Sequence, residues 1–279
     1  MANKHMSLER IEIRKRKQFK HPFLESNMKN EKIPRILHYC WFGKGGKNKT
    51  IKKCMSSWKK YCKRYKVMGW NEKTFDIDKA PIYVKEAFKM KKWAFVSDYV
   101  RLWALERFGG VYIDTDVEII KPLDKFLVHE GFSGFSEIRA GDFRIPAALM
   151  GAKKGNGYIK YLLSYYKNKK FIKKNRSPDL RANIFIITEM TLAKYKFKLN
   201  NSYQEIPNYA YYPAEFFTPK FKHHRYKPII TKNTYCIHYH NESWVSFPEK
   251  LKIEALILLS YLGFKKPLRK IYRSLKNKK

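Results

Sequence analysis

The sequence predicts an α/β domain with a mostly parallel sheet, and three features indicate this. Near residue 33 the chain begins a strand, helix, strand succession, and later a long helical stretch ends at Gly109-Gly110 and leads directly into another strand. A hydrophobic content of 44% is enough to bury a large core, and no Gly-, Ser- or Pro-rich linker divides the chain. We therefore expect one α/β domain with basic appendages at both ends.

The first expected elements are short and regularly spaced. Residues 36–42 are strand-like, and the glycines from Gly43 onward end them. Residues 51–62 carry apolar side chains at helical spacing with lysines opposite, which predicts an amphipathic helix. Residues 65–71 then form a second strand. This alternation favours a sheet with helices on its faces.

The remaining elements continue the pattern. A helix, in one piece or two, is expected over residues 83–110, and a strand follows at once over 111–120. A further amphipathic helix is expected over 157–171, and a last strand over 234–240.

The chain is strongly basic. Lys and Arg number 60 against 24 Asp and Glu, a formal charge of +36. Such a charge attracts nucleic acid, an anionic membrane surface or phosphorylated substrates, although a lysine-rich composition that merely coats the surface gives the same count. No RNA-binding, zinc-finger or helix-turn-helix pattern is present. A nucleic-acid-binding protein is therefore the weaker alternative, and no nucleic-acid partner is expected.

Cysteine spacing and hydropathy predict the compartment. The four cysteines form neither a CxxC pair nor zinc spacing, which favours a reducing cytosol. No signal peptide is apparent, and the first residues resemble a vector-derived leader. The longest apolar run, residues 255–264, is too short to span a bilayer. We expect a cytoplasmic protein, with peripheral attachment to the inner face of the cytoplasmic membrane left open.

Two acids stand where a hydrophobic strand ends. Asp114 and Asp116 follow the apolar residues 111–113, at an edge of the sheet where α/β proteins bind ligands. Side chains two apart on a strand project to the same side, so the carboxylates repel each other unless a cation lies nearby. Mg²⁺ commonly uses one or two carboxylates and substrate phosphates. The alternative is an ordinary acidic turn.

Four stretches of the chain resemble glycosyltransferase family 32. They are "IPRILHYCWFG", "SSWKKYCKRYKVMGWNEKTFDI", "AFVSDYVRLWALERFGGVYIDTDVEIIKPL" and "CIHYHNESW". That family includes the yeast initiating α-mannosyltransferase and many bacterial capsule enzymes, and it is more distantly related to the large clostridial glucosylating toxins. The resemblance covers residues 33–124 and 235–244, and the middle of the chain poorly.

The resemblance implies a GT-A fold, a Rossmann-like, mostly parallel sheet flanked by helices in a single domain. We expect a basic N-terminal extension over residues 1–32, the catalytic domain over 33–248, and an amphipathic basic helix or tail over 249–279.

The resemblance also implies that Mn²⁺ or Mg²⁺ is held on a nucleotide diphosphate. Asp116 would bind the metal directly, and Asp114 would contact the ribose, or the metal through water. His238 matches the first histidine of the C-terminal motif, and it or Glu242 would complete the metal site. The family often has a second histidine next, where this chain has Tyr239, so the third ligand stays open.

The resemblance assigns the donor site in the same way. Asp98 and Arg101, three apart on a helix, would grip the donor sugar, the alternative being a surface ion pair. Trp41 would stack on the base, the alternative being a core residue, and Tyr112 would lie near the base or ribose. Ser243 and Trp244 would form a lid over the diphosphate. His240 receives no role. Residues 181–192 occupy the region where sugar and acceptor contacts are expected, but they lack the Gly-Pro element of relatives, so none is assigned.

The reaction expected from the resemblance is retaining transfer of a hexose or N-acetylhexosamine by front-face displacement. A UDP-sugar is favoured over GDP-mannose as the donor. The acceptor would be a glycan, lipid-linked in one version, in capsule or surface polysaccharide synthesis. A toxin-like effector that glycosylates a protein is the alternative.

The last 31 residues carry an apolar helical face followed by lysines and arginines, "EKLKIEALILLSYLGFKKPLRKIYRSLKNKK". Such a segment lies on an anionic membrane or packs its apolar face on the catalytic domain. The sequence leaves both open.

Overall fold

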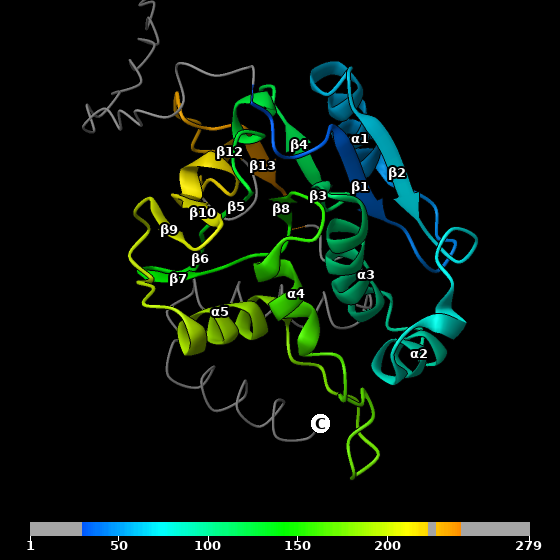
Figure 1. The fold of residues 1–279 in the computed structure, drawn as a ribbon. Coiled ribbons are helices and arrows are strands. Elements are labelled where there is room, and N and C mark those ends of the chain that lie inside the picture. The colour runs from blue at the N-terminus through cyan, green and yellow to red at the C-terminus, as the bar shows by residue number, and fades with distance from the viewer. Residues whose placement is uncertain (1–29, 223–226, 241–279) are drawn as a thin grey trace, which may run out of the picture.

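A seven-stranded sheet forms the centre of the computed structural model, which describes residues 30–222 and 227–240 (Figure 1). The strand order is β2-β1-β3-β8-β5-β10-β9. The bounds are β1 Ile36–Cys40, β2 Lys66–Trp70, β3 Gly110–Ile113, β5 Gly131–Gly134, β8 Leu149–Ala152, β9 Gln204–Ile206 and β10 Tyr209–Tyr212. All strands but β8 and β9 run in one direction. The predicted mostly parallel α/β sheet is therefore confirmed.

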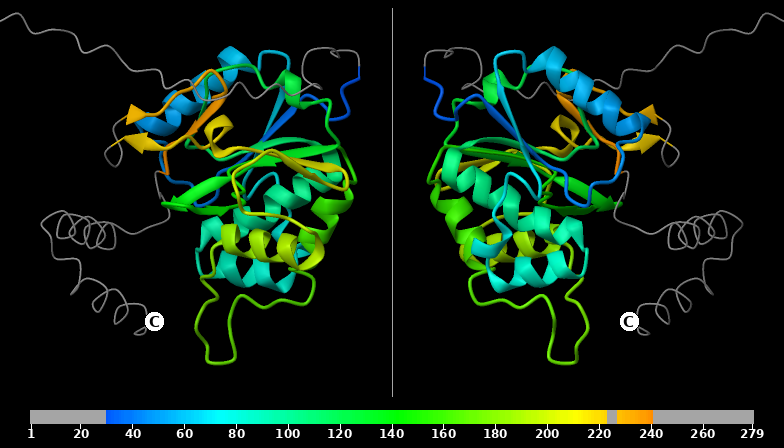
Figure 2. Two further views of the ribbon diagram at one scale, coloured as in Figure 1. Left: turned by 90° about the vertical axis from the view of Figure 1, so that its left-hand side faces the viewer. Right: turned by 90° about the vertical axis from the view of Figure 1, so that its right-hand side faces the viewer.

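Helices cover both faces of the sheet (Figure 2). On one face lie α2 (Ile82–Lys89), α3 (Trp93–Phe108), α4 (Gly157–Ser164) and α5 (Asn183–Lys194). On the other lie α1 (Lys49–Tyr61) and a two-stranded ladder of β4 (Val117–Ile119) and β13 (Cys236–His238). The smaller elements are η1 Ile77–Lys79, η2 Asp124–Phe126, β6 Ser136–Arg139, β7 Asp142–Arg144, η3 Ala214–Phe216, β11 Phe221–Lys222 and β12 Lys227–Pro228.

The core has two parts, one on each face of the sheet. Val100 and Leu105 of α3 pack with Tyr158 of α4 on the first face. Trp58 of α1 packs with Ile119 of β4 and the buried Phe126 on the second. Because both faces are covered, the central strands are buried throughout, which explains their nearly continuous apolar sequence.

Local sequence sets where the elements near the site begin and end. The side chain of Asn48 accepts a hydrogen bond from the amide of Ile51 and so caps α1. At the end of α3, Gly109 and Gly110 take φ values of +67° and +109°, which other residues rarely adopt. A Cβ on Gly110 would also lie 2.6 Å from the carbonyl oxygen of Ile36. The two glycines therefore permit α3 to lead straight into β3.

Several expected boundaries differ from the structure. The strand expected over 111–120 is two strands, because the amide of Val117 bonds to the carbonyl of Asp114 and closes a turn. The helix expected over 157–171 ends at Ser164 and continues as turns. The stretch 83–110 forms two helices, α2 and α3.

The appendages expected at 1–32 and 249–279 lie outside the described residues, apart from residues 30–32. Within the described ranges, no helix has the length and apolar character needed to cross a membrane.

Candidate active site

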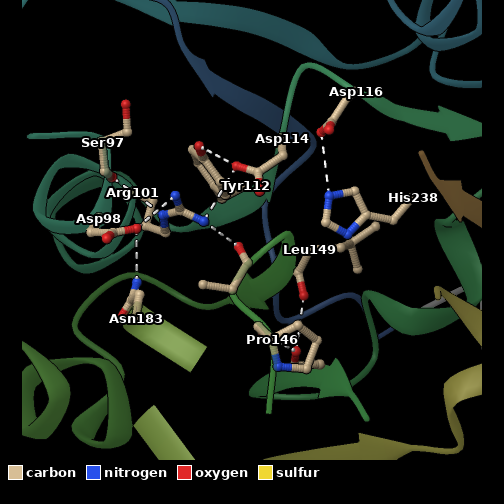
Figure 3. Close-up of polar contacts among 12 residues, drawn as sticks. Ser97, Asp98, Arg101, Tyr112, Asp114, Asp116, Pro146, Leu149, Asn183 and His238 are labelled. Atoms are coloured by element: carbon tan, nitrogen blue, oxygen red, sulfur yellow. Dashed lines mark hydrogen bonds and ion pairs between the residues drawn. The ribbon is translucent and has the colours of Figure 1, made fainter. Parts of the chain in front are cut away.

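Two acids and a histidine meet at the carboxyl end of β3 (Figure 3). Potential ligand atoms of Asp114, Asp116 and His238 all lie within 4.8 Å of one another. Asp114 follows β3, Asp116 directly precedes β4, and His238 ends β13, which pairs with β4. The sequence predicted that Asp114 and Asp116 project to the same side because they alternate along one strand. That reason was wrong, because a turn between β3 and β4 carries both residues, but the two carboxylates do lie close together.

His238 is oriented toward Asp116. Its Nε2 lies 3.4 Å from Asp116 Oδ1, while its Nδ1 is buried without a hydrogen-bond partner among the described residues. Burial acts to lower the pKa of His238, but the negative charges of Asp116 and Asp114 outweigh it and raise the pKa. Two carboxylates around an imidazole thus form a site that attracts positive charge. This donor set fits a divalent cation such as Mn²⁺, which accepts oxygen and imidazole ligands.

Arg101 is buried beside the acids and spans several elements. Its guanidinium lies 2.9 Å from Asp98 and 3.3 Å from Asp114, and it donates to the carbonyl of Ala147 at 2.8 Å. Burial alone would lower the pKa of Arg101, yet the charges around it, Asp114 above all, raise it. The guanidinium is therefore a permanent cation that fixes the position of Asp114 relative to α3.

Asp98 faces the opposite way, toward α5. Asn183 Nδ2 donates to Asp98 Oδ1 at 3.2 Å. Burial raises the pKa of Asp98 to about 6, although Arg101 opposes the rise. Both side chains of the Asp98–Arg101 pair are at most 12% exposed, so the alternative of a surface ion pair is excluded.

Asn183 was not singled out in the sequence, although the segment around it was expected near the sugar. Its Oδ1 is buried and has no partner among the described residues. A buried, unpaired acceptor is costly unless a ligand satisfies it. The one indication in the sequence was that Asn183 lies within residues 181–192, the segment expected to contact the sugar and the acceptor.

Tyr112 lies beneath the charged groups. Its hydroxyl donates to Asp114 at 2.8 Å, and the carbon of the Arg101 guanidinium lies 4.7 Å from its ring centroid. Tyr112 is only 1% exposed, so it is packed in the core against both Asp114 and Arg101. Its expected contact with the base or ribose stays a prediction.

Trp41 comes directly after β1, which runs parallel to β3, so it lies at the same edge of the sheet as Asp114. The residue is partly exposed, its indole N–H donates to Gly45, and Lys47 lies 4.9 Å from its ring centroid. A half-exposed ring at this edge is placed to meet a ligand, and base stacking stays a prediction.

The C-terminal part of the predicted site is only partly described. Glu242, Ser243 and Trp244 lie outside the described residues. His240, to which no role was assigned, lies with its ring centroid 3.9 Å from that of His238. The charge on His238 and burial lower the pKa of His240 to about 3. His240 is thus a neutral neighbour of the acid and histidine cluster.

Comparison with known proteins agrees with this arrangement. Residues 48–133 match the family described as "Glycosyltransferase sugar-binding region containing DXD motif", and this range includes Asp98, Arg101, Asp114 and Asp116. No curated protein matches the chain.

Solved structures with a similar fold include two glycosyltransferases. A structure described as the PaToxG glycosyltransferase is 17% identical, with a TM-score of 0.41 over 58% of this chain and 70% of that one. A glycosyltransferase involved in the glycosylation of the major capsid of PBCV-1 is 11% identical, with a TM-score of 0.40 over 74% of this chain and 95% of that one. The family match and the clustered DTD motif confirm that this chain is a glycosyltransferase, similar to family 32 and carrying its DXD sugar-binding region.

Proposed function

We propose that the protein transfers a hexose or N-acetylhexosamine from a nucleotide sugar, a UDP-sugar in preference to GDP-mannose, to a glycan acceptor with retention of configuration. The observation that supports this most is the grouping of Asp114, Asp116 and His238 directly beside the buried Asp98–Arg101 pair. The first group suits a cation on a diphosphate, and the second offers hydrogen-bonding groups for a sugar.

Asp116 and His238 would hold Mn²⁺ or Mg²⁺, with Asp114 as a further ligand or as a partner of the ribose. A bound divalent ion would stabilise the negative charge of the departing diphosphate, as a Lewis acid does in place of a proton. Asp114 cannot swing freely, because the Tyr112 hydroxyl and the Arg101 guanidinium both hold its Oδ1. The protein therefore fixes one carboxylate in advance and leaves Asp116 oriented by His238.

The donor sugar would lie against Asp98 and Asn183. Asp98 keeps acceptor capacity beyond its bonds to Arg101 and Asn183, and the unpaired Oδ1 of Asn183 can accept from a sugar hydroxyl. Two fixed acceptors select an orientation of the ring, because a hydroxyl that is missing or inverted leaves a buried acceptor unpaired. In this arrangement the sugar would lie beside the leaving diphosphate, as a front-face displacement requires.

The deciding experiment is a screen of nucleotide-sugar hydrolysis with Mn²⁺, in the presence and absence of EDTA. We expect one UDP-sugar to be hydrolysed faster than GDP-mannose, and hydrolysis to stop in EDTA. Preference for GDP-mannose would refute the donor assignment, and undiminished hydrolysis in EDTA would refute the metal-dependent reaction. Analysis of the anomeric configuration of a transferred sugar would test retention.

We propose a role in capsule or surface polysaccharide synthesis, with a lipid-linked glycan as one form of the acceptor. This proposal depends on the family resemblance and on the basic segment 249–279, which lies outside the described residues. Co-sedimentation with anionic vesicles of the full chain and of a chain ending at residue 248 would test membrane attachment. Equal sedimentation of both would refute a role for residues 249–279.

A further inference from the structure

A second charged site lies at the opposite end of the sheet from the DTD motif. A cavity of about 190 Å³ is lined by residues at the end of α1 and just before the starts of β1 and β2. Because these strands run parallel to β3, their amino ends lie at the far edge from Asp114. The cavity is lined by Arg35, Lys60, Tyr61, Lys63, Arg64, Tyr65, Pro122 and Asp124. It is therefore separate from the candidate active site.

The cavity carries an excess of positive charge. Arg35 and Arg64 both pair with Asp124, and Arg35 also pairs with Glu31. Lys60 and Lys63 are exposed, and neither forms an ion pair with any described residue. Thus two acids face four cations, and two ammonium groups at the rim are left uncompensated.

A buried donor in the wall of the cavity also lacks a partner. The Tyr65 hydroxyl forms no hydrogen bond with a described residue, although Tyr65 is only 7% exposed. Burial raises the pKa of Tyr65, so the hydroxyl keeps its proton and can donate. An unpaired buried hydroxyl is destabilising by itself, and a ligand oxygen would remove that cost. This observation is independent of the charge count and also indicates an anion.

The chain segment that supplies Lys60, Tyr61, Lys63, Arg64 and Tyr65 of the lining is rich in cations along its whole length. No Asp or Glu occurs between Gly43 and Asn71. The cations of this stretch are Lys44, Lys47, Lys49, Lys52, Lys53, Lys59, Lys60, Lys63, Arg64 and Lys66. Among described residues, only Lys53 and Arg64 find an acidic partner. Residues 153–181 also hold ten Lys and Arg, and there five of the ten are paired with acids among the described residues, namely Lys153, Lys160, Lys169, Lys173 and Arg181. The cavity thus lies in the less compensated of the two stretches.

We propose that this cavity binds a phosphate monoester. Such a group carries a charge of about −1.5 to −2 at pH 7 and three acceptor oxygens, which matches an excess of two cations better than one carboxylate does. Guanidinium groups are well suited to phosphate, and Lys60, Lys63 and Tyr65 supply further donors. The phosphate can belong to a soluble phosphorylated glycan or to a lipid headgroup, since both present the same chemistry.

The proposal is tested by calorimetric titration of the full chain with glycerol 3-phosphate in EDTA at constant ionic strength. K60Q/K63Q removes the two unpaired charges, and Y65F removes only the hydroxyl. K49Q/K52Q removes the same charge from α1 away from the cavity and is the matched control. We expect K60Q/K63Q to weaken binding by about tenfold or more and Y65F by about fivefold, the loss of one hydrogen bond, with the control unchanged.

Equal weakening in K60Q/K63Q and K49Q/K52Q would show general charge attraction and overturn the site. Glucuronate binding as tightly as glycerol 3-phosphate would overturn the phosphate assignment. A second titration uses vesicles of phosphatidylcholine with phosphatidic acid. If K60Q/K63Q weakens binding of the vesicles more than binding of glycerol 3-phosphate, the phosphate belongs to a lipid headgroup. The reverse result assigns it to a soluble phosphorylated compound. Nucleotide-sugar hydrolysis should be unchanged in K60Q/K63Q, so this site and the proposed transfer reaction can fail independently.

Discussion

The guanidinium of Arg101 lies 3.3 Å from the carboxylate of Asp114, and this contact joins the middle of α3 to the turn that carries the DTD motif. The same guanidinium holds Asp98, which in turn contacts the first residue of α5. The groups proposed to meet the sugar are therefore joined by a continuous chain of polar contacts to Asp114, one of the groups proposed to meet the diphosphate. Its parts can still be separated by substitution.

Asp116→Asn should abolish metal-dependent turnover. The substitution removes the negative charge that faces His238, and we expect the rate to fall by about three orders of magnitude or more, the scale of several kcal/mol of lost charge stabilisation. Initial rates and Mn²⁺ affinity should be measured together. Asp78→Asn, at an exposed position in η1, is the control and should behave like the unsubstituted protein. Normal Mn²⁺ affinity in Asp116→Asn would contradict the assignment.

Asn183→Ala should weaken the productive binding of the donor sugar but not of the nucleotide. Losing one hydrogen bond of about 1–1.5 kcal/mol corresponds to roughly a five- to twelvefold rise in the donor KM. Product inhibition by UDP should stay the same, because the proposed contact is with the sugar. Glu189→Gln, at an exposed position on the same helix, is the control. A matching loss of UDP affinity would place Asn183 at the nucleotide instead.

Trp41→Ala should reduce UDP affinity by about 1–3 kcal/mol, the usual range for base stacking on an aromatic ring. Trp41→Phe should keep most of the affinity, because it keeps an aromatic face. Binding can be followed by calorimetry and folding by thermal melting. If Trp41→Ala melts early yet binds UDP normally, the ring is a structural residue.

His38 should make stability depend on pH. Its Nε2 donates to the carbonyl of Gly109 at 2.8 Å, and its Nδ1 accepts from the Trp70 indole at 3.2 Å, so the folded protein requires the neutral ring. Burial lowers its pKa from 6.5 to about 4. Between pH 6.5 and about 4, His38 is protonated in the unfolded chain but stays neutral in the folded protein. The free energy of unfolding should therefore fall as the pH drops through this interval.

The His38 contribution is at most about 3 kcal/mol over that interval. His38→Gln should be less stable at neutral pH and should lose this part of the slope in denaturant titrations. His129→Gln, which removes a histidine elsewhere in the fold, should keep it. An unchanged slope in His38→Gln would contradict the assignment.

The sequence predicted the strands and helices up to residue 120, α4 and the last strand because apolar periodicity and glycine stops are local signals, but it did not predict β5, β8, β9, β10 or α5. The link from α3 through Gly109 and Gly110 into β3 is an example, since both glycines adopt positive φ values. Local signals could not show the turn at Asp114, where a single backbone bond from Val117 divides the strand. They also could not show the antiparallel direction of β8, which depends on partners far along the chain.

The candidate site also has features that the sequence could predict and features that it could not. Asp98 and Arg101 are three residues apart on one helix, so their pairing was predictable, but its burial under α5 was not. Asn183 was missed because its contact with Asp98 joins residues 85 positions apart, which no local pattern indicates. His240 was set aside as having no role, and only the fold shows that its ring lies against that of His238. Contacts between distant segments carry no local signature.

The ladder of β4 and β13 also determines when the acid and histidine cluster can form. Glu118 and Tyr239 are 121 residues apart, and their side chains meet at 2.5 Å beside it. Asp116 and His238 are brought together by the same ladder, so the cluster is incomplete until nearly all of the described chain has been synthesised and β13 has docked. A cation bound by Asp116 and His238 would link β4 to β13 only after both strands had paired. Because only the completed fold presents these ligands together, Mn²⁺ should raise the melting temperature of the whole protein, and a chain that ends before Cys236 should gain nothing from it.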